Sequence, residues 1–376
     1  MITNRKTQLA AAVGTALLAF GGGAQAQALE AKVSGQVNRA IMHADDGVQK
    51  KTFNVDNEIS GTRFRFAGNA QMMPGIRAGV LLEWDYQSNE SQLVTMAVPS
   101  SPAATSATSS QLLVERYLEA YFEHGSFGQL RLGQGDGAAN GGVEVDLSGT
   151  AIINSAPVTD LGGALAFRAT GGTVPATPPT IGGVIVQQDF ESRYDRIMYV
   201  TPTFGGFRLQ ASNGVKDTFN TQEAALWYSG KLGGFGDLVG AFGWSQQAQG
   251  PGSAKDEVIG GSVSWLHTSG FSLTYGHTTR DIPLAGVDLG STRDGKFDYF
   301  KVAYKFGGKH AVGVDYAVGK DQAAAGDDAK MIGIGYVFSP IGWAEIYAGY
   351  KKHSLDRPGT TFEDIALFTV GTRLKF

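Results

Sequence analysis

The residues that could perform chemistry in this 376-residue chain are few and widely separated. Cysteine is absent, which excludes disulfides and thiolate metal sites. The six histidines show no metal-ligand spacing among themselves; they are His43, His124, His267, His277, His310 and His353. The G-x-S-x-G motif does not occur, and nucleophilic catalysis needs a nucleophile and a base within hydrogen-bonding reach. The sequence therefore predicts neither an enzyme nor a metal or cofactor site.

Phosphate and nucleic-acid ligands are not expected either. Residues 133–137 read Gly-Gln-Gly-Asp-Gly, but the spacing is not G-x-G-x-x-G and no helical pattern with a lysine follows. The formal net charge is −4, whereas binding to nucleic acid requires clustered excess Lys and Arg. The charged residues must therefore serve another purpose.

Those charges alternate with apolar side chains along segments of about ten residues, which is typical of transmembrane β-strands. In residues 76–87 one face carries Ile76, Val80, Leu82, Trp84 and Tyr86, and the other carries Arg77, Glu83 and Asp85. A cation facing lipid would cost about 2–4 kcal/mol at mid-membrane, so the charged face must line water. Residues 53–70 alternate likewise, with Arg63 and Arg65 inward.

Eight long and seven short connectors separate sixteen such segments, from Lys32 to the C-terminus. The expected fold is all-β, a 16-stranded antiparallel transmembrane barrel with short periplasmic turns and long outer loops. Aromatic residues cluster beside the short turns, as a belt at one membrane interface would; they are Phe127, Phe204, Phe207, Phe235, Phe271, Phe306, Phe338 and Trp343. The third long connector, residues 135–191, is too long for an idle link, and its first glycines favour a sharp inward bend.

The N-terminus predicts export. Arg5 and Lys6 precede an apolar run over residues 9–20, and Ala24-Gln25-Ala26 supplies a cleavage site. We expect a signal peptide at residues 1–26, with cleavage after Ala28 as the alternative, and one barrel domain at 27–376. No linker or change of hydrophobic period divides this domain. Removing Arg5 and Lys6 takes the formal charge from −4 to −6.

Several segments resemble the general porins of Gram-negative outer membranes: residues 59–85, 116–134 and 193–207, and the ending Leu374-Lys375-Phe376. The resemblance covers essentially the whole mature chain. It implies a homotrimer of 16-stranded barrels in outer-membrane lipid, each a water-filled channel for small polar solutes that is narrowed by an inward-folded third loop. It also implies recognition of the terminal Phe376 by the barrel assembly machinery.

In this family the third loop carries carboxylates that face basic residues on the opposite wall. Glu144, Asp146 and Asp160 are the acids that we expect in this role. An acid in a long polar loop is equally compatible with simple solvation.

For the basic wall we expect Arg63, Arg65, Arg116, Arg131 and Arg196. Regular alternation would place Arg116 on the same face of the sheet as its lipid-facing neighbours, so it faces the lumen only if a bulge or the barrel rim intervenes. Arg193 and Arg196 have opposite parity, and a regular strand turns only one of them inward. We favour Arg196.

Opposed charges in a hydrated pore orient dipolar solutes and disfavour apolar ones. The lumen as a whole is mildly acidic, which predicts weak cation preference. The alternative is a substrate-specific channel for a sugar or an organic anion, although no continuous aromatic track is evident. A purely structural or adhesive barrel would differ from both by failing to conduct.

Overall fold

The computed structural model describes residues 30–98, 113–217, 219–248, 255–283 and 292–376. The expected signal peptide lies outside these residues. The described chain is almost entirely β. Its strands are β1 (Glu30–Asp45), β2 (Lys50–Asp56), β3 (Arg63–Met73), β4 (Ile76–Asp85), β5 (Val114–His124), β6 (Gly128–Asp136), β7 (Ala169–Gly172), β8 (Arg193–Val200), β9 (Phe207–Lys216), β10 (Phe219–Lys231), β11 (Asp237–Ala248), β12 (Lys255–Leu266), β13 (Phe271–Pro283), β14 (Thr292–Phe306), β15 (His310–Lys320), β16 (Asp328–Ile341), β17 (Ala344–Asp356), β18 (Thr360–Phe362) and β19 (Ile365–Lys375). Short helical turns are η1 (Glu58–Ser60), η3 (Val158–Asp160), α2 (Ile181–Val184) and η4 (Gly233–Phe235). None of the helices in the described residues is long and apolar enough to cross a membrane.

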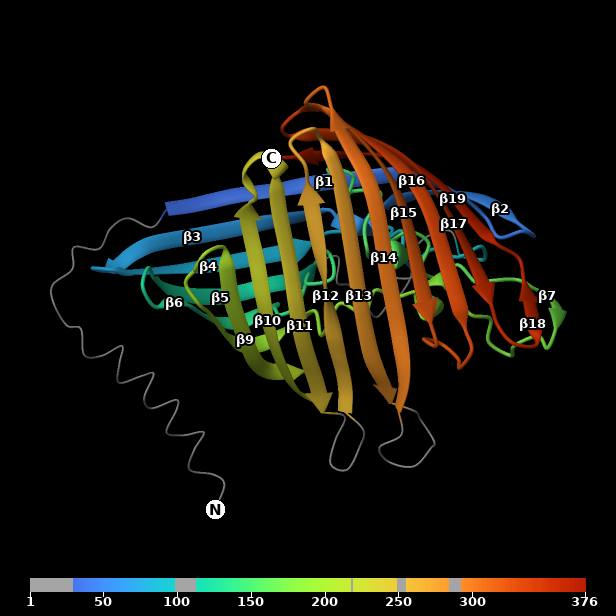
Figure 1. Ribbon diagram of the computed structural model, residues 1–376, viewed down its shortest axis with the longest axis horizontal. Helices are drawn as coiled ribbons and strands as arrows, with labels where there is room; N and C mark the ends of the chain where they lie inside the picture. The colour runs from blue at the N-terminus through green and yellow to red at the C-terminus, as the bar shows by residue number, and fades with distance from the viewer. Residues whose placement is uncertain (1–29, 99–112, 218, 249–254, 284–291) are drawn as a thin grey trace, which may run out of the picture.

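Seventeen of the strands form one antiparallel sheet that closes on itself (Figure 1). Closure is made by β1 and β19, which pair from Gln36–Lys375 to Asp45–Ala366. Both β2 and β3 pair with β1, at its second and first halves respectively, so together they occupy one position in the barrel. The barrel therefore has sixteen strand positions, as the alternation of the sequence predicts.

Side chains alternate across the barrel wall. On β14, Phe300 and Val302 are about half exposed on the outer surface, whereas Tyr299 and Lys301, which alternate with them, are buried on the inside. Because a lysine on the lipid face would be costly, this register keeps the cation in the lumen. On β16, Ile332, Ile334 and Tyr336 face outward in the same way.

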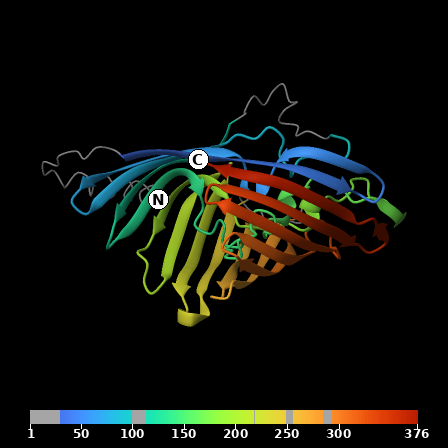
Figure 2. The ribbon, with the colours of Figure 1, turned by 90° about the horizontal axis from the view of Figure 1, so that it is seen from above.

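The connector between β6 and β8, residues 137–192, is called loop 3 below, and it lies inside the barrel. Figure 2 shows it in green between the blue strands β1–β3 and the orange and red strands β14–β17. Its apolar residues pack against inward-facing apolar side chains of the wall, so the core of the molecule fills part of the lumen. Members from loop 3 include Val143, Ile153, Leu161, Leu165, Phe167 and Ile185, and members from the wall include Met42, Phe53, Val258, Phe297, Met331 and Leu367.

The expectation of one unbroken second strand over residues 53–70 is wrong. The structure interrupts it between Asp56 and Arg63 with η1. Asn57 caps this turn, because its side chain accepts a hydrogen bond from the N–H of Ile59 at 3.1 Å. Its amide also donates to the carbonyl of Ile152 in loop 3 at 2.9 Å. Side chain–backbone bonds of this kind compete with strand pairing and bring the backbone of residues 57–62 into the lumen.

The part of loop 3 farthest from its ends reaches another connector. Within it, β7 pairs with β18, which belongs to the segment between β17 and β19. Arg168 of loop 3 also contacts Asp46, between β1 and β2, with 2.6 Å between Nε and Oδ2. Figure 1 shows β7 and β18 together at one end of the molecule. Loop 3 is thus held to two neighbouring connectors as well as to the wall.

Candidate functional site

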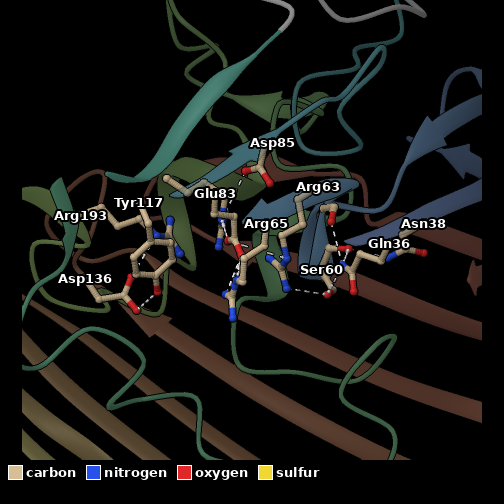
Figure 3. A network of polar contacts seen from close by, with 12 residues as sticks. Gln36, Asn38, Ser60, Arg63, Arg65, Glu83, Asp85, Tyr117, Asp136 and Arg193 are labelled. Atoms are coloured by element: carbon tan, nitrogen blue, oxygen red, sulfur yellow. Dashed lines mark hydrogen bonds and ion pairs between the residues drawn. The ribbon is translucent and has the colours of Figure 1, made fainter. Parts of the chain in front are cut away.

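A cluster of arginines and carboxylates lines the wall at β3, β4 and β5 (Figure 3). The buried carboxylate of Glu83 contacts Arg65 at 2.5 Å and Arg116 at 2.7 Å, and Arg63 lies 3.9 Å away. Arg116 also contacts Asp85 at 2.8 Å. One buried acid therefore orients the guanidinium groups of Arg65 and Arg116, because charge-assisted hydrogen bonds fix the planar fork of an arginine.

Arg116 reaches this cluster through a bulge. The pairing of β4 with β5 shifts at this point, since Glu83 pairs with Tyr117 whereas Trp84 pairs with Glu115. Arg116 is the extra residue. A bulge re-aims the side chain of the inserted residue, which resolves the conflict of parity with its lipid-facing neighbours.

A second cluster lies on β5, β6 and β8. The side chain of Glu119 is fully buried between Arg131, at 2.6 Å, and Arg196, at 2.5 Å. The buried guanidinium of Arg196 also donates to the carbonyls of Asp136 and Gly133, both at 2.8 Å. Arg196 thereby ties the start of loop 3 to the wall as well as carrying charge.

Two further arginines, not among those predicted for the basic wall, also lie at the cavity between loop 3 and the wall. Arg193 begins β8, next to Ser192 at a positive φ of 57°, so strand parity does not govern its direction. Its guanidinium contacts Asp136 at 2.9 Å and lies over the ring of Tyr117 (Figure 3). Arg280 lies on β13, which continues to Pro283, and its Nε donates to Asp256 at 2.8 Å.

Three acids of loop 3 face the wall cluster across a cavity: Glu144, Asp160 and Asp189. Glu144 accepts a hydrogen bond from Gln187 at 3.2 Å, and Asp189 accepts from the N–H groups of Gly141 at 2.6 Å and Val143 at 3.2 Å. Burial, followed by the charge of neighbouring carboxylates, raises the pKa of Asp160 and of Asp189 well above the ordinary range. Burial also raises the pKa of Glu144.

Asp146, the third acid expected at the constriction, lies elsewhere in the lumen. Its carboxylate pairs with the buried ammonium of Lys301 on β14. Lys301 also donates to the carbonyl of Asn154 at 2.8 Å. In this position Asp146 attaches loop 3 to the wall.

The two sets of charges meet around a cavity of about 380 Å³. Its charged lining consists of Arg63, Arg116, Arg193 and Arg280, with Glu58, Glu144, Asp160 and Asp189. Arg65, Arg131 and Arg196 do not line it. Arg65 shares the carboxylate of Glu83 with Arg116, which does line it. No cluster of acidic and histidine side chains suited to a metal ion occurs among the described residues.

Glu58 and Asp189 were not selected from the sequence. Asp189 lies within the range 135–191 and could have been included as a loop acid. The break in alternation at Asn57–Gly61 is the signal that could have shown a turn presenting Glu58 to the lumen.

A closed 16-stranded barrel with charged groups facing one another across an internal cavity is typical of a channel-forming membrane protein. A family model described as Gram-negative porin matches residues 10–358, and the chain belongs to this family. Porins are channel proteins of the outer membrane.

Solved structures agree on the fold. The anion-selective porin from Comamonas acidovorans is 17% identical with a TM-score of 0.66, over 93% of this chain and 100% of that one. OmpT of Vibrio cholerae is 15% identical with a TM-score of 0.59, over 94% and 100%. OmpF of Salmonella typhi, in complex with daunomycin, is 13% identical with a TM-score of 0.59, over 92% and 97%. A search of curated proteins found no match.

Proposed function

We propose that this porin is a passive diffusion channel for small hydrophilic solutes and ions, with weak cation preference and no catalytic activity. The observation that carries the proposal is the cavity between loop 3 and the β3–β5 wall, lined by charges of both signs. Fixed opposed charges orient water and dipolar solutes, so passage of an apolar solute requires reorganisation of ordered water. Arg63, Arg116, Arg193 and Arg280 form the basic side of this constriction, with Arg65 held next to Arg116 by Glu83. Glu144, Asp160 and Asp189 form the acidic side.

The cation preference rests on which charges are already neutralised. Arg116, Arg193 and Arg280 contact carboxylates on neighbouring strands, namely Glu83, Asp85, Asp136 and Asp256. In contrast, Glu144, Asp160 and Asp189 form no ion pair with any described residue. When ionised, these loop acids attract mobile cations.

The test is the reversal potential of the purified protein in a planar bilayer across a KCl gradient. We expect current carried preferentially by K⁺, and the preference should weaken in the double variant Glu144→Gln, Asp160→Asn. Arg116→Gln should strengthen it, because Glu83 and Asp85 lose a partner. Electrical silence would overturn the channel, and a preference for Cl⁻ would overturn the selectivity. Selective uptake of one sugar from a panel would favour a substrate-specific channel.

Assembly follows from the same family. We propose that the protein is exported by a signal peptide at residues 1–26. We also propose that it forms a homotrimer, because OmpT of Vibrio cholerae, which has a similar fold, is known in a trimer form. The terminal Phe376 is 68% exposed, and its backbone exchanges two hydrogen bonds of 2.9 Å with Gly35 of β1. This exposed ring at the barrel seam fits recognition by the assembly machinery. Mass measurement of the detergent complex and N-terminal sequencing of the mature protein test these points.

A further inference from the structure

A groove on the lumen side of β9 and β10 combines an aromatic surface with a cation that lacks a carboxylate. Arg208 and Trp227 are direct cross-strand partners in the pairing of β9 with β10. Their outward neighbours, Phe207 and Leu209, are exposed on the barrel surface, so alternation turns Arg208 inward. The guanidinium carbon of Arg208 lies 5.9 Å from the centre of the Trp227 ring.

Hydrogen bonds fix both side chains. The indole N–H of Trp227 donates to the carbonyl of Ala138 in loop 3 at 3.2 Å. Gln210, with its amide oriented to suit its neighbours, accepts from Nε and Nη2 of Arg208 at 3.0 and 2.8 Å. The same amide donates to Ala138 at 3.3 Å. These bonds leave Nη1 of Arg208 without a partner among the described residues.

The local charge is positive. No carboxylate among the described residues pairs with Arg208. Lys305, which donates to the carbonyl of Leu147 at 3.2 Å, is also exposed and has no ion pair with a described residue. Asp146 lines the groove, but Lys301 already neutralises it. An anion entering the groove therefore meets the cation of Arg208 and no free acid, while Lys305 lies outside the lining of the groove.

The remaining walls are mostly apolar. The groove has a volume of about 320 Å³ and is lined by Val145 and Leu147 of loop 3 and by Val239 of β11, besides Trp227 and Arg208. Thr203 and Gly206, from the short β8–β9 turn, also line it, so it opens toward the short-turn end of the barrel. Such a site suits a planar apolar body beside the indole and one negative group beside the guanidinium.

We propose that this groove is a binding subsite for small aromatic carboxylates. The subsite is separate from the constriction: none of Val145, Leu147, Arg208, Trp227 and Val239 lines the larger cavity. The inference deepens the proposed channel function, since such a solute reaches the groove only through a hydrated lumen.

Isothermal titration of the detergent-solubilised protein with benzoate tests binding without requiring conduction. We expect saturable binding that Trp227→Leu and Arg208→Gln each weaken by roughly tenfold. Trp227→Phe keeps an aromatic ring and should retain most of the affinity. The matched control is Arg77→Gln, which removes the same charge from an exposed position on β4. Acetate and benzyl alcohol, which each supply half of the recognised chemistry, should bind at least tenfold more weakly than benzoate.

Benzoate added on the short-turn side of a bilayer should also interrupt the single-channel current, and the two substitutions should reduce the blocking in parallel. Absence of benzoate binding would overturn the subsite, as would equal affinity for acetate or equal losses with Arg77→Gln. If binding is saturable and depends on both residues while the protein fails to conduct, the subsite stands and the channel function falls. Each variant is checked for an intact barrel by its heat-modifiable migration on gels.

Discussion

At the scale of single residues, Glu119 has the most demanding environment. Its fully buried carboxylate contacts Arg131 and the fully buried Arg196. Removing one partner from a buried ion pair leaves an uncompensated charge, which costs about 3–5 kcal/mol. We expect Glu119→Gln to lower the free energy of unfolding by about this amount, measured by urea unfolding in detergent.

Glu123 on the same strand provides the control, because its side chain is exposed and forms no ion pair within the described residues. Glu123→Gln should change the unfolding free energy by less than about 1 kcal/mol. Equal effects of the two substitutions would show that Glu119 contributes no more than a solvated lumen acid.

Strand alternation was sufficient to predict the inward side for some of these residues. Arg131 and Arg196 lie on the lumen side, where both contact Glu119, and Arg116 does so through the bulge that its position in the alternation required. Arg193 could not be predicted in this way, because it begins a strand and its direction is set by Ser192 in the left-handed region. Whether each arginine acts at the constriction stays a prediction.

At the scale of elements, the position of loop 3 depends on serine hydroxyl groups in the wall and on a notch, formed where two wall glycines lack side chains. Ser212, Ser262 and Ser264 accept hydrogen bonds from its backbone at 2.9–3.1 Å. Gly335 and Gly349 are cross-strand partners, and Ile153 of loop 3 packs against both. Because these contacts join residues more than seventy positions apart, the sequence predicts a long inward loop but not its course.

Filling this notch should displace loop 3. A Cβ on Gly335 would lie 1.8 Å from Oδ1 of Asn154 and 2.5 Å from Cγ2 of Ile153, so Gly335→Val forces the loop away from the wall. Overpacking of this kind costs about 1–3 kcal/mol of stability. The displaced loop narrows the opening toward the arginines, and we expect a lower single-channel conductance. The control is Gly342→Ala, where nothing lies within 4 Å; conductance equal to wild type in Gly335→Val would contradict this account.

At the scale of the whole molecule, the closed sheet was the most predictable feature. Period-two alternation and the succession of long and short connectors specify sixteen strand positions, because lipid on one face of the sheet requires apolar side chains and water on the other face admits polar ones. The apolar side chains that fill part of the lumen were harder to predict from the sequence. Inward residues such as Met42, Phe297 and Met331 pack against loop 3 and not against water, and a polar interior is the simpler expectation from periodicity.

The same filling makes selectivity depend on pH. Burial raises the pKa of Asp160 and Asp189 well above the ordinary range and raises that of Glu144, so these acids gain protons before solvated carboxylates, which titrate near about 4. As pH falls through these raised values, the loop loses negative charge while the arginines remain charged. We therefore expect cation preference to decline on acidification at a pH clearly above 4. Reversal potentials in a KCl gradient at successive pH values measure this decline.

The stability of the barrel should change in the opposite direction. A carboxyl whose pKa is raised in the folded state binds its proton more tightly there than in the unfolded chain, so its contribution favours folding below the unfolded pKa and is lost as pH rises through the folded pKa. In the double variant Glu144→Gln, Asp160→Asn, both the change in selectivity and the change in stability over this window should shrink. Asp364→Asn removes an acid that pairs with Lys352 at 2.6 Å outside loop 3 and should leave both unchanged. A decline of cation preference confined to pH values near 4, or one that persists in the double variant, would assign it to solvated carboxylates outside loop 3.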